Sequence, residues 1–362
     1  MHNHRLTTQK GQMRIFKKVI RWVGLVLGGV LLLFISLLVF PEKETVKVIQ
    51  PRANTQYWNM QEGFKIAYTH LPTADSLQKP PVVFLHGGPG GYVHSSIINT
   101  LEQLTATGHS VYLYDQRGSG LSDRMEKYSD INFEKHLLDL DEIISQHIRA
   151  TQVILIGQSF GSTIIAHYSA RHPEKVAKIV FSSPATFKPY KQIAGRYVAV
   201  DSLYPAPDSL QFKTPYNFNK DVDNMALKPK AMVASMGALL LDTKLISDQQ
   251  MDRMLNTLAS QFTKGMVCDP KNVLPEEGGG GLYAYIATNS DDYPEIRPQV
   301  KTVQAPILVL QGQCEYHSYG SAYEYVALYP NSSYAFIEDA GHEIWWEQEA
   351  RYLEEIIAFL EK

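Results

Sequence analysis

The stretch VILIGQSFGSTIIAHY, residues 153–168, passes from an apolar run to a helical pattern within one short turn. Its first four residues have the β-branched character of a buried strand, and the apolar residues after the turn recur at helical spacing. The turn places Ser159 between Gly157 and Gly161. Glycine is needed on both sides where the two backbones approach closely. The stretch therefore predicts a strand-turn-helix unit that holds Ser159 at a tight corner.

Four further apolar runs are bounded by glycine or proline: PPVVFLHGG, HSVYLYDQRG, KVAKIVFSSP and APILVLQGQ. Such near-continuous runs are typical of parallel strands that are buried on both faces. Helical patterns lie between them, and this alternation predicts an α/β fold with right-handed crossovers. The alternation is interrupted at 185–302, where only helical patterns stand out. We therefore expect a helical cap at 185–302, inserted between two parts of the sheet domain at 56–184 and 303–362.

The N-terminus predicts a membrane anchor. No charged residue occurs from 22 to 40, and four basic residues stand just before this run. About 19 apolar residues match the thickness of a bilayer core. The basic flank predicts a cytoplasmic segment at 1–21, a transmembrane helix at 22–40, a linker at 41–55 and the remaining domain on the periplasmic or extracellular side. A cleaved signal peptide and a buried helix are the alternatives, disfavoured by the missing small-x-small cleavage site and by the basic flank respectively.

The charge and the cysteine content of the chain argue against several classes of protein. The net charge is −3 and both signs are mixed along the chain, so no nucleic-acid-binding surface is indicated. Two cysteines, Cys268 and Cys314, occur without a CxxC motif or a cysteine-histidine cluster. A zinc site and a scaffold of several disulfides are therefore not expected. A single bridge between the two cysteines is an open alternative in an oxidising compartment.

The sequence contains candidates for a catalytic triad. In G-x-S-x-G, the serine lies on a strained strand-to-helix turn with its hydroxyl accessible. On this type of sheet the acid and the histidine follow the serine in that order. Glu315 comes after the strand-like ILVLQG, and His342 follows the strand-like YAFIE. Asp339 is too close in sequence to His342 to orient it, and Glu338 belongs with the strand. We therefore predict Ser159 as nucleophile, His342 as base and Glu315 as the orienting acid.

A glycine-rich segment supplies candidates for stabilising an oxyanion. HGGPGG, residues 86–91, follows a strand and leaves backbone N–H groups open to a ligand. The N–H groups of Gly88 and Phe160 are predicted to form the oxyanion hole of an acyl-transfer enzyme. Neither G-x-G-x-x-G nor a Walker lysine occurs, which argues against a phosphate-binding role for this segment.

The motifs HGGPGG, YDQRGSGLS, GQSFGS, PILVLQG and AGH stand in the order seen in α/β-hydrolases, and the first two resemble the proline iminopeptidase branch, the S33 serine peptidases. This resemblance implies eight mostly parallel strands, a helical cap inserted after the sixth strand, and hydrolysis through an acyl-enzyme without a cofactor. The sequence departs from the pattern of this branch at two points. Glu315 replaces the usual aspartate, and no glutamate lies between Glu174 and Glu276, although iminopeptidases of this kind bind the substrate amine with cap glutamates.

The expected function is a membrane-anchored serine hydrolase that resembles proline iminopeptidases and acts on short peptides or aminoacyl amides. A carboxylesterase or lactonase acting on small esters is the first alternative. A membrane-tethered binding protein that has lost catalysis is the second, disfavoured by the intact order of serine, acid and histidine. Dehalogenase or epoxide hydrolase chemistry would need a carboxylate at the position of Ser159.

Overall fold

The computed structural model describes residues 2–39, 46–74, 79–187, 190–193, 196–213, 229–288 and 293–362. One eight-stranded sheet forms the centre of the domain, in the order β1-β2-β4-β3-β5-β6-β9-β10. β1 and β2 pair antiparallel, as do β2 and β4, and the other neighbours are parallel. The strands are β1 (Thr55–Asn59), β2 (Lys65–Leu71), β3 (Val82–Leu85), β4 (Val111–Tyr114), β5 (Val153–Gln158), β6 (Val176–Ser182), β9 (Ile307–Gly312) and β10 (Ser332–Ile337). The predicted α/β architecture is confirmed.

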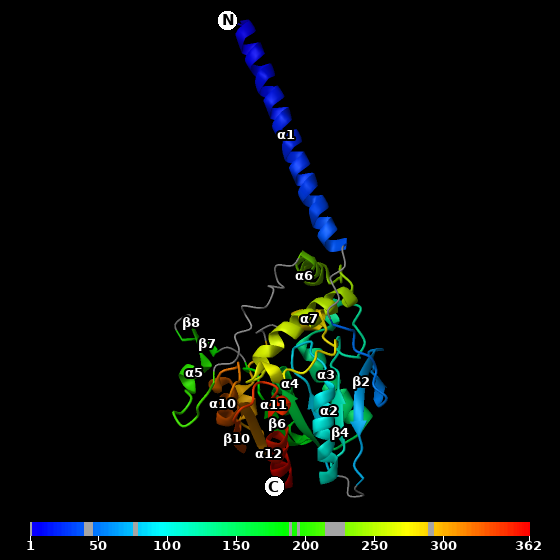
Figure 1. The fold of residues 1–362 in the computed structure, drawn as a ribbon, viewed down its shortest axis with the longest axis vertical. Helices are drawn as coiled ribbons and strands as arrows, with labels where there is room; N and C mark the ends of the chain where they lie inside the picture. Colours follow the sequence, from blue (N-terminus) through cyan, green and yellow to red (C-terminus); the bar gives the residue numbers. More distant parts are fainter. Residues whose placement is uncertain are drawn as a thin grey trace.

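Helices cover both faces of this sheet (Figure 1). Every residue of β3, β5 and β9 is buried, because each of these strands has helices on both sides. The helices of one layer are α3 (Phe133–Glu142), α4 (Phe160–Arg171), α9 (Arg297–Val300) and α10 (Tyr319–Leu328). Those of the other layer are α2 (Ser95–Glu102), α11 (Ile344–Glu347) and α12 (Glu349–Glu361).

The segment predicted as a cap contains three longer helices with a core of their own. They are α6 (Pro229–Leu241), α7 (Asp248–Phe262) and α8 (Leu282–Thr288), preceded by the short α5 (Val200–Leu203). The expectation of helices alone is wrong at one place, because β7 (Tyr190–Ile193) and β8 (Arg196–Val198) form a two-stranded antiparallel sheet. Strands of four and three residues are too short to produce a recognisable alternation in the sequence.

The N-terminal helix α1 (His2–Val39) extends away from the rest of the chain (Figure 1). Its apolar span, Phe16–Ser36, has a mean hydropathy of 2.2 and none of it is buried. The span starts earlier than the predicted 22–40, and Phe40 and the linker to residue 45 lie outside the described residues. Length and composition of this kind are shared by membrane anchors and signal sequences.

Candidate active site

Ser159 occupies the corner between β5 and α4. Its backbone has a φ of 51° and a ψ of −118°, an unusual conformation for a residue other than glycine. A Cβ on Gly161 would lie 2.2 Å from the carbonyl oxygen of Leu85, and one on Gly157 would lie 2.8 Å from the carbonyl of Gly161. Both glycines are therefore needed for the close approach of helix and strands. The surrounding packing holds Ser159 in its strained conformation at the carboxyl edge of the sheet.

Glu315 and His342 form a buried pair. The Nδ1 atom of His342 lies 2.8 Å from Oε1 of Glu315, which also accepts a 2.9 Å hydrogen bond from the backbone N–H of His317. Burial alone would raise the pKa of Glu315, but the adjacent imidazole and these hydrogen bonds lower it to about 2. Burial favours neutral His342, but the Glu315 carboxylate outweighs this and raises the pKa of the imidazole. The pair has the geometry of an oriented general base.

Tyr316 lies next to this pair. Its hydroxyl lies 3.2 Å from Nε2 of His342, and Ser159 offsets part of the rise that burial causes in the pKa of this hydroxyl. Ser159, Tyr316 and His342 line the same cavity, and Tyr316 is 38% exposed. Sequence analysis missed it, although its position directly after Glu315 was a usable signal.

The predicted oxyanion-hole residues lie beside the serine. Phe160 opens α4, so its N–H belongs to the free donors of a helix N-terminus. Gly88 lines the cavity with Ser159, and a Cβ on the preceding Gly87 would lie 2.8 Å from Cβ of Ser159. The HGGPGG segment thus packs directly against the candidate nucleophile, while the role of the two N–H groups stays a prediction.

A cavity of about 430 Å³ opens above Ser159. Its floor is formed by Ser159, His342 and the glycine-rich segment, and helix α7 contributes apolar side chains such as Leu255 and Phe262. Two carboxylates, Glu276 and Glu343, also line it. Among the described residues, no group of three or more histidine, cysteine, aspartate or glutamate side chains is arranged to hold a metal ion.

The two carboxylates are partly desolvated. Burial raises the pKa of Glu343 to about 7 despite the nearby imidazole of His342, and Glu276 contributes to this rise. Burial also raises the pKa of Glu276, whose carboxylate accepts hydrogen bonds from the hydroxyl of Tyr92 (2.6 Å) and from the N–H of Gly278 (3.1 Å). Sequence analysis missed both residues as site components, although Glu343 directly follows the candidate histidine.

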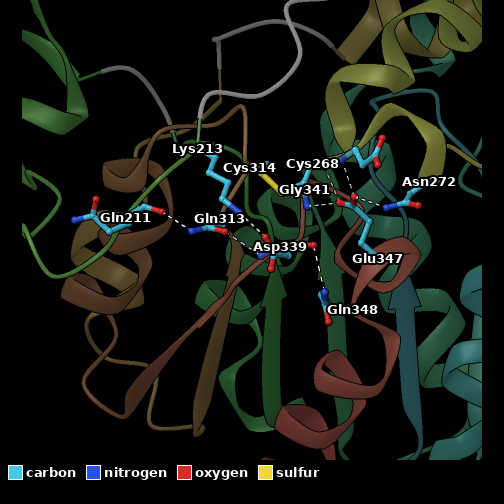
Figure 2. The surroundings of a disulfide bond; sticks show 11 residues. Gln211, Lys213, Cys268, Asn272, Gln313, Cys314, Asp339, Gly341, Glu347 and Gln348 are labelled. Carbon is cyan, nitrogen blue, oxygen red and sulfur yellow. Dashed lines mark hydrogen bonds and ion pairs between the residues drawn. A yellow bond between two sulfur atoms is a disulfide. The ribbon is translucent and has the colours of Figure 1, made fainter.

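A disulfide joins the cap to the loop that carries Glu315 (Figure 2). The bridge is formed by Cys268 and Cys314, so the two cysteines are paired, a possibility that the sequence left open. Beside it, the Glu347 carboxylate accepts hydrogen bonds from the N–H groups of Cys268 (2.8 Å) and Gly341 (2.9 Å). Cap, acid loop and histidine loop are therefore linked at one point, one residue away from both Glu315 and His342.

Replacing both cysteines, Cys268→Ala with Cys314→Ala, is expected to destabilise the fold. The bridge closes a segment with a sequence separation of 46 residues. The chain-entropy model gives about 4 kcal/mol of lost unfolding free energy for a loop of this length. Denaturant unfolding of the full chain in detergent measures this difference. Wild-type protein under reducing conditions is the matched control and should unfold like the variant, whereas equal stability of oxidised wild type and variant would contradict the prediction.

Relatives of known name align with much of this chain. A proline iminopeptidase of Saccharolobus solfataricus is 23% identical over 320 residues, which cover 84% of this chain and 93% of that protein. A proline iminopeptidase of Heyndrickxia coagulans is 36% identical over 109 residues, but this match covers only 30% of this chain and 36% of the relative. The stronger local similarity is thus confined to about a third of the relative's length.

Solved structures and a family comparison agree on the fold. A putative aryl esterase from Burkholderia cenocepacia superimposes with a TM-score of 0.57 at 16% identity, covering 85% of this chain and 98% of that one. An esterase from Exiguobacterium antarcticum gives 0.54 at 16% identity, with coverages of 84% and 99%. At such identities the likeness concerns the fold alone. The family described as alpha/beta hydrolase fold matches residues 80–349, about three quarters of the sequence, and the chain belongs to this family.

Proposed function

We propose that the protein is a serine hydrolase that releases N-terminal residues from short peptides or aminoacyl amides, in the manner of a proline iminopeptidase. The observation that carries this proposal is the hydrogen-bonded series Glu315, His342 and Tyr316. Its last two members line one cavity together with Ser159 and two carboxylates. The hydrolase fold and the iminopeptidase relatives support the class of reaction.

In the proposed mechanism, Ser159 attacks the substrate carbonyl while Nε2 of His342 accepts its proton. Glu315 holds the imidazole by its Nδ1–H and stabilises the imidazolium that forms. The N–H groups of Gly88 and Phe160 stabilise the oxyanion. Protonated His342 then gives its proton to the leaving amine, and a water molecule activated by the same imidazole hydrolyses the acyl-enzyme.

The Tyr316 hydroxyl lies 3.2 Å from Nε2 of His342, so we propose that it moves aside when this nitrogen accepts the proton of Ser159. The exposure of Tyr316 to the cavity gives the side chain room to move when substrate enters. Tyr316 is accordingly proposed to fill the reaction centre in the absence of substrate and not to transfer the proton itself.

Glu343 and Glu276 are proposed to bind the free amine of the substrate. Both line the cavity, and a protonated amine between them would relieve the repulsion and desolvation that raise their pKa values. Gln158, next to the serine, donates a 3.4 Å hydrogen bond to Glu343, which holds this carboxylate beside the reaction centre. An amine site built from these two residues would make up for the absence of glutamates between Glu174 and Glu276.

Glu343→Gln is expected to separate amide from ester substrates. Loss of one charge-assisted hydrogen bond costs about 1.5–3 kcal/mol, so kcat/KM for prolyl anilide should fall by about 10- to 100-fold. Turnover of a short ester without an amine should change little. The pKa of Glu343 is about 7 in the folded protein, and only the ionised carboxylate binds a protonated amine. Amide turnover by the wild-type protein should therefore rise as the pH increases through 7. The pH dependence of ester turnover should lack this rise.

The matched control is Glu338→Gln, which changes an exposed glutamate near the same loop and should leave both substrates unaffected. An equal loss for ester and amide in Glu343→Gln would contradict the assigned amine site.

A carboxylesterase is the second candidate, favoured by the apolar part of the cavity wall. Leu255, Leu258 and Phe262 of α7 face the space above Ser159 and suit an apolar acyl or alcohol group. A panel of aminoacyl anilides beside short-chain esters separates the two candidates. Turnover of prolyl anilide supports the peptidase, and turnover of esters alone supports the esterase.

We further propose that α1 is an uncleaved anchor with its basic end in the cytoplasm, so that the catalytic domain lies on the outer side. The disulfide between Cys268 and Cys314 supports this orientation, because such bonds persist in oxidising compartments. Protease added to cells whose outer envelope has been removed, with the cytoplasmic membrane intact, should degrade the domain but spare the N-terminal segment. Protection of the whole chain until that membrane is lysed would contradict the orientation.

A further inference from the structure

Helix α6 carries its small residues inward and its large apolar residues outward. Ala231, Ala234 and Ala238 belong to a buried cluster that also contains residues of α7 and α8. The large side chains at i, i+4, i+7 and i+8 on the other face, and those just after them, are 48–73% exposed: Met232, Met236, Leu239, Leu240, Leu241 and Leu245. We call these six residues the α6 apolar face. A surface helix in water normally has the opposite arrangement, so this face indicates an apolar partner.

The charges of α6 fit an apolar partner as well. The helix contains no acidic residue, and its only charged residue, Lys230, is 1% exposed on the inner side. Covering the α6 apolar face would therefore remove no charge of the helix from water. With 13 residues, the helix is too short to span a bilayer but has the length of an interfacial segment.

The position of α6 indicates what this partner is. α6 contacts α1, the helix with the membrane-length apolar span, at the side of the domain from which α1 extends (Figure 1). The C-terminal helix α12 lies at the opposite end of the molecule (Figure 1). A bilayer crossed by α1 would thus be next to α6 and far from α12.

The connection after α1 is short and tied to the cap region. The N–H of Ile49 donates a 3.2 Å hydrogen bond to the carbonyl oxygen of Gly278, in the loop that also carries Glu276. A Cβ on Gly278, whose φ is +83°, would lie 1.8 Å from the carbonyl oxygen of Lys47, so the two segments are closely apposed. The residues from Val39 to Ile49 span at most about 35 Å when fully extended. This tether keeps the cap side of the domain close to the end of α1.

We propose that the α6 apolar face lies in the headgroup–acyl boundary of the bilayer that α1 spans, as a second membrane contact of the protein. Helix α7, which shares this buried cluster with α6, contributes Leu255, Leu258 and Phe262 to the wall of the cavity. The proposed contact rests on the anchoring by α1 proposed above, but it holds whichever substrate the cavity accepts.

The test uses the full chain in phosphatidylcholine nanodiscs with a fluorophore on a single introduced thiol, since the two native cysteines are paired. Leu240→Cys reports on the α6 apolar face, Leu31→Cys on α1, and Glu354→Cys on exposed α12. Lipid carrying a doxyl quencher near the headgroup is then added to the nanodiscs. We expect several-fold stronger quenching at positions 240 and 31 than at 354. Adding Met236→Glu and Leu239→Glu to Leu240→Cys should abolish the quenching at 240 without lowering the unfolding temperature.

Three results would overturn the proposal. Quenching at 31 without quenching at 240 would place α6 away from the lipid. A label at 240 that is shielded from water but not quenched, and only when two chains share a disc, would identify a second copy as the partner. Absence of quenching at both 31 and 240 would show that neither α1 nor α6 contacts the lipid.

Discussion

Ser159→Ala is expected to abolish hydrolysis of every substrate that the wild-type protein turns over. Removing the nucleophile of a serine hydrolase lowers kcat by about 10⁴-fold or more, because no acyl-enzyme forms and only residual stabilisation by the site remains. The variant should still fold, since alanine keeps the Cβ and Ser159 makes no side-chain cap to α4. Initial rates on esters and anilides, with fluorophosphonate labelling of the full chain, measure the effect.

Ser183→Ala is the matched control, because Ser183 is another buried serine with a positive φ, directly after the neighbouring strand β6. It should retain both turnover and labelling. Tyr316→Phe removes only the hydroxyl that we propose moves aside, and its rate should stay within about tenfold of wild type, below the contribution of a proton-transferring group. Labelling that persists in Ser159→Ala would assign the reaction to another residue, and a large loss in Tyr316→Phe would make Tyr316 part of the proton path.

Glu315→Gln is expected to lower kcat by about 10³- to 10⁴-fold, because the amide no longer stabilises the imidazolium or holds the correct tautomer of His342. The change should also appear in the pH profile. The Glu315 carboxylate raises the pKa of His342, and activity requires the neutral ring, so wild-type kcat/KM falls as pH drops through this raised pKa. Without the carboxylate the pKa of His342 falls, and the acid limb of the remaining activity should move to lower pH.

Asp339→Asn is the matched control for this prediction. Asp339 is exposed and pairs with Lys213, away from the imidazole, so its loss should change neither rate nor pH profile. A loss of activity in Asp339→Asn equal to that in Glu315→Gln, or an unchanged acid limb in the latter, would argue against Glu315 as the orienting acid.

Much of the fold was predictable because its signals are local. The apolar runs at β3, β5 and β9 are buried on both faces, and their sequences contain little else than large hydrophobic residues. The glycines at 157 and 161 indicate a close approach that the backbone requires. The short strands β7 and β8 have no such local signal in their sequences. The composition of α6 is that of a buried helix, so the exposure of the α6 apolar face could not be predicted from it.

The sequence by itself determined the α/β sheet, the corner at Ser159 and the order of serine, glutamate and histidine. Strand burial and turn geometry depend on residues that are close together in the sequence, so both leave a local pattern. Only the tertiary structure decided that Glu315 contacts His342, that Tyr316 contacts His342 beside Ser159 in the cavity, and that Cys268 pairs with Cys314. It also brought Glu276 into the same cavity as Glu343. These partners are brought together where parallel strands end at one edge and a cap folds over it, and such long-range contacts leave no pattern within either segment.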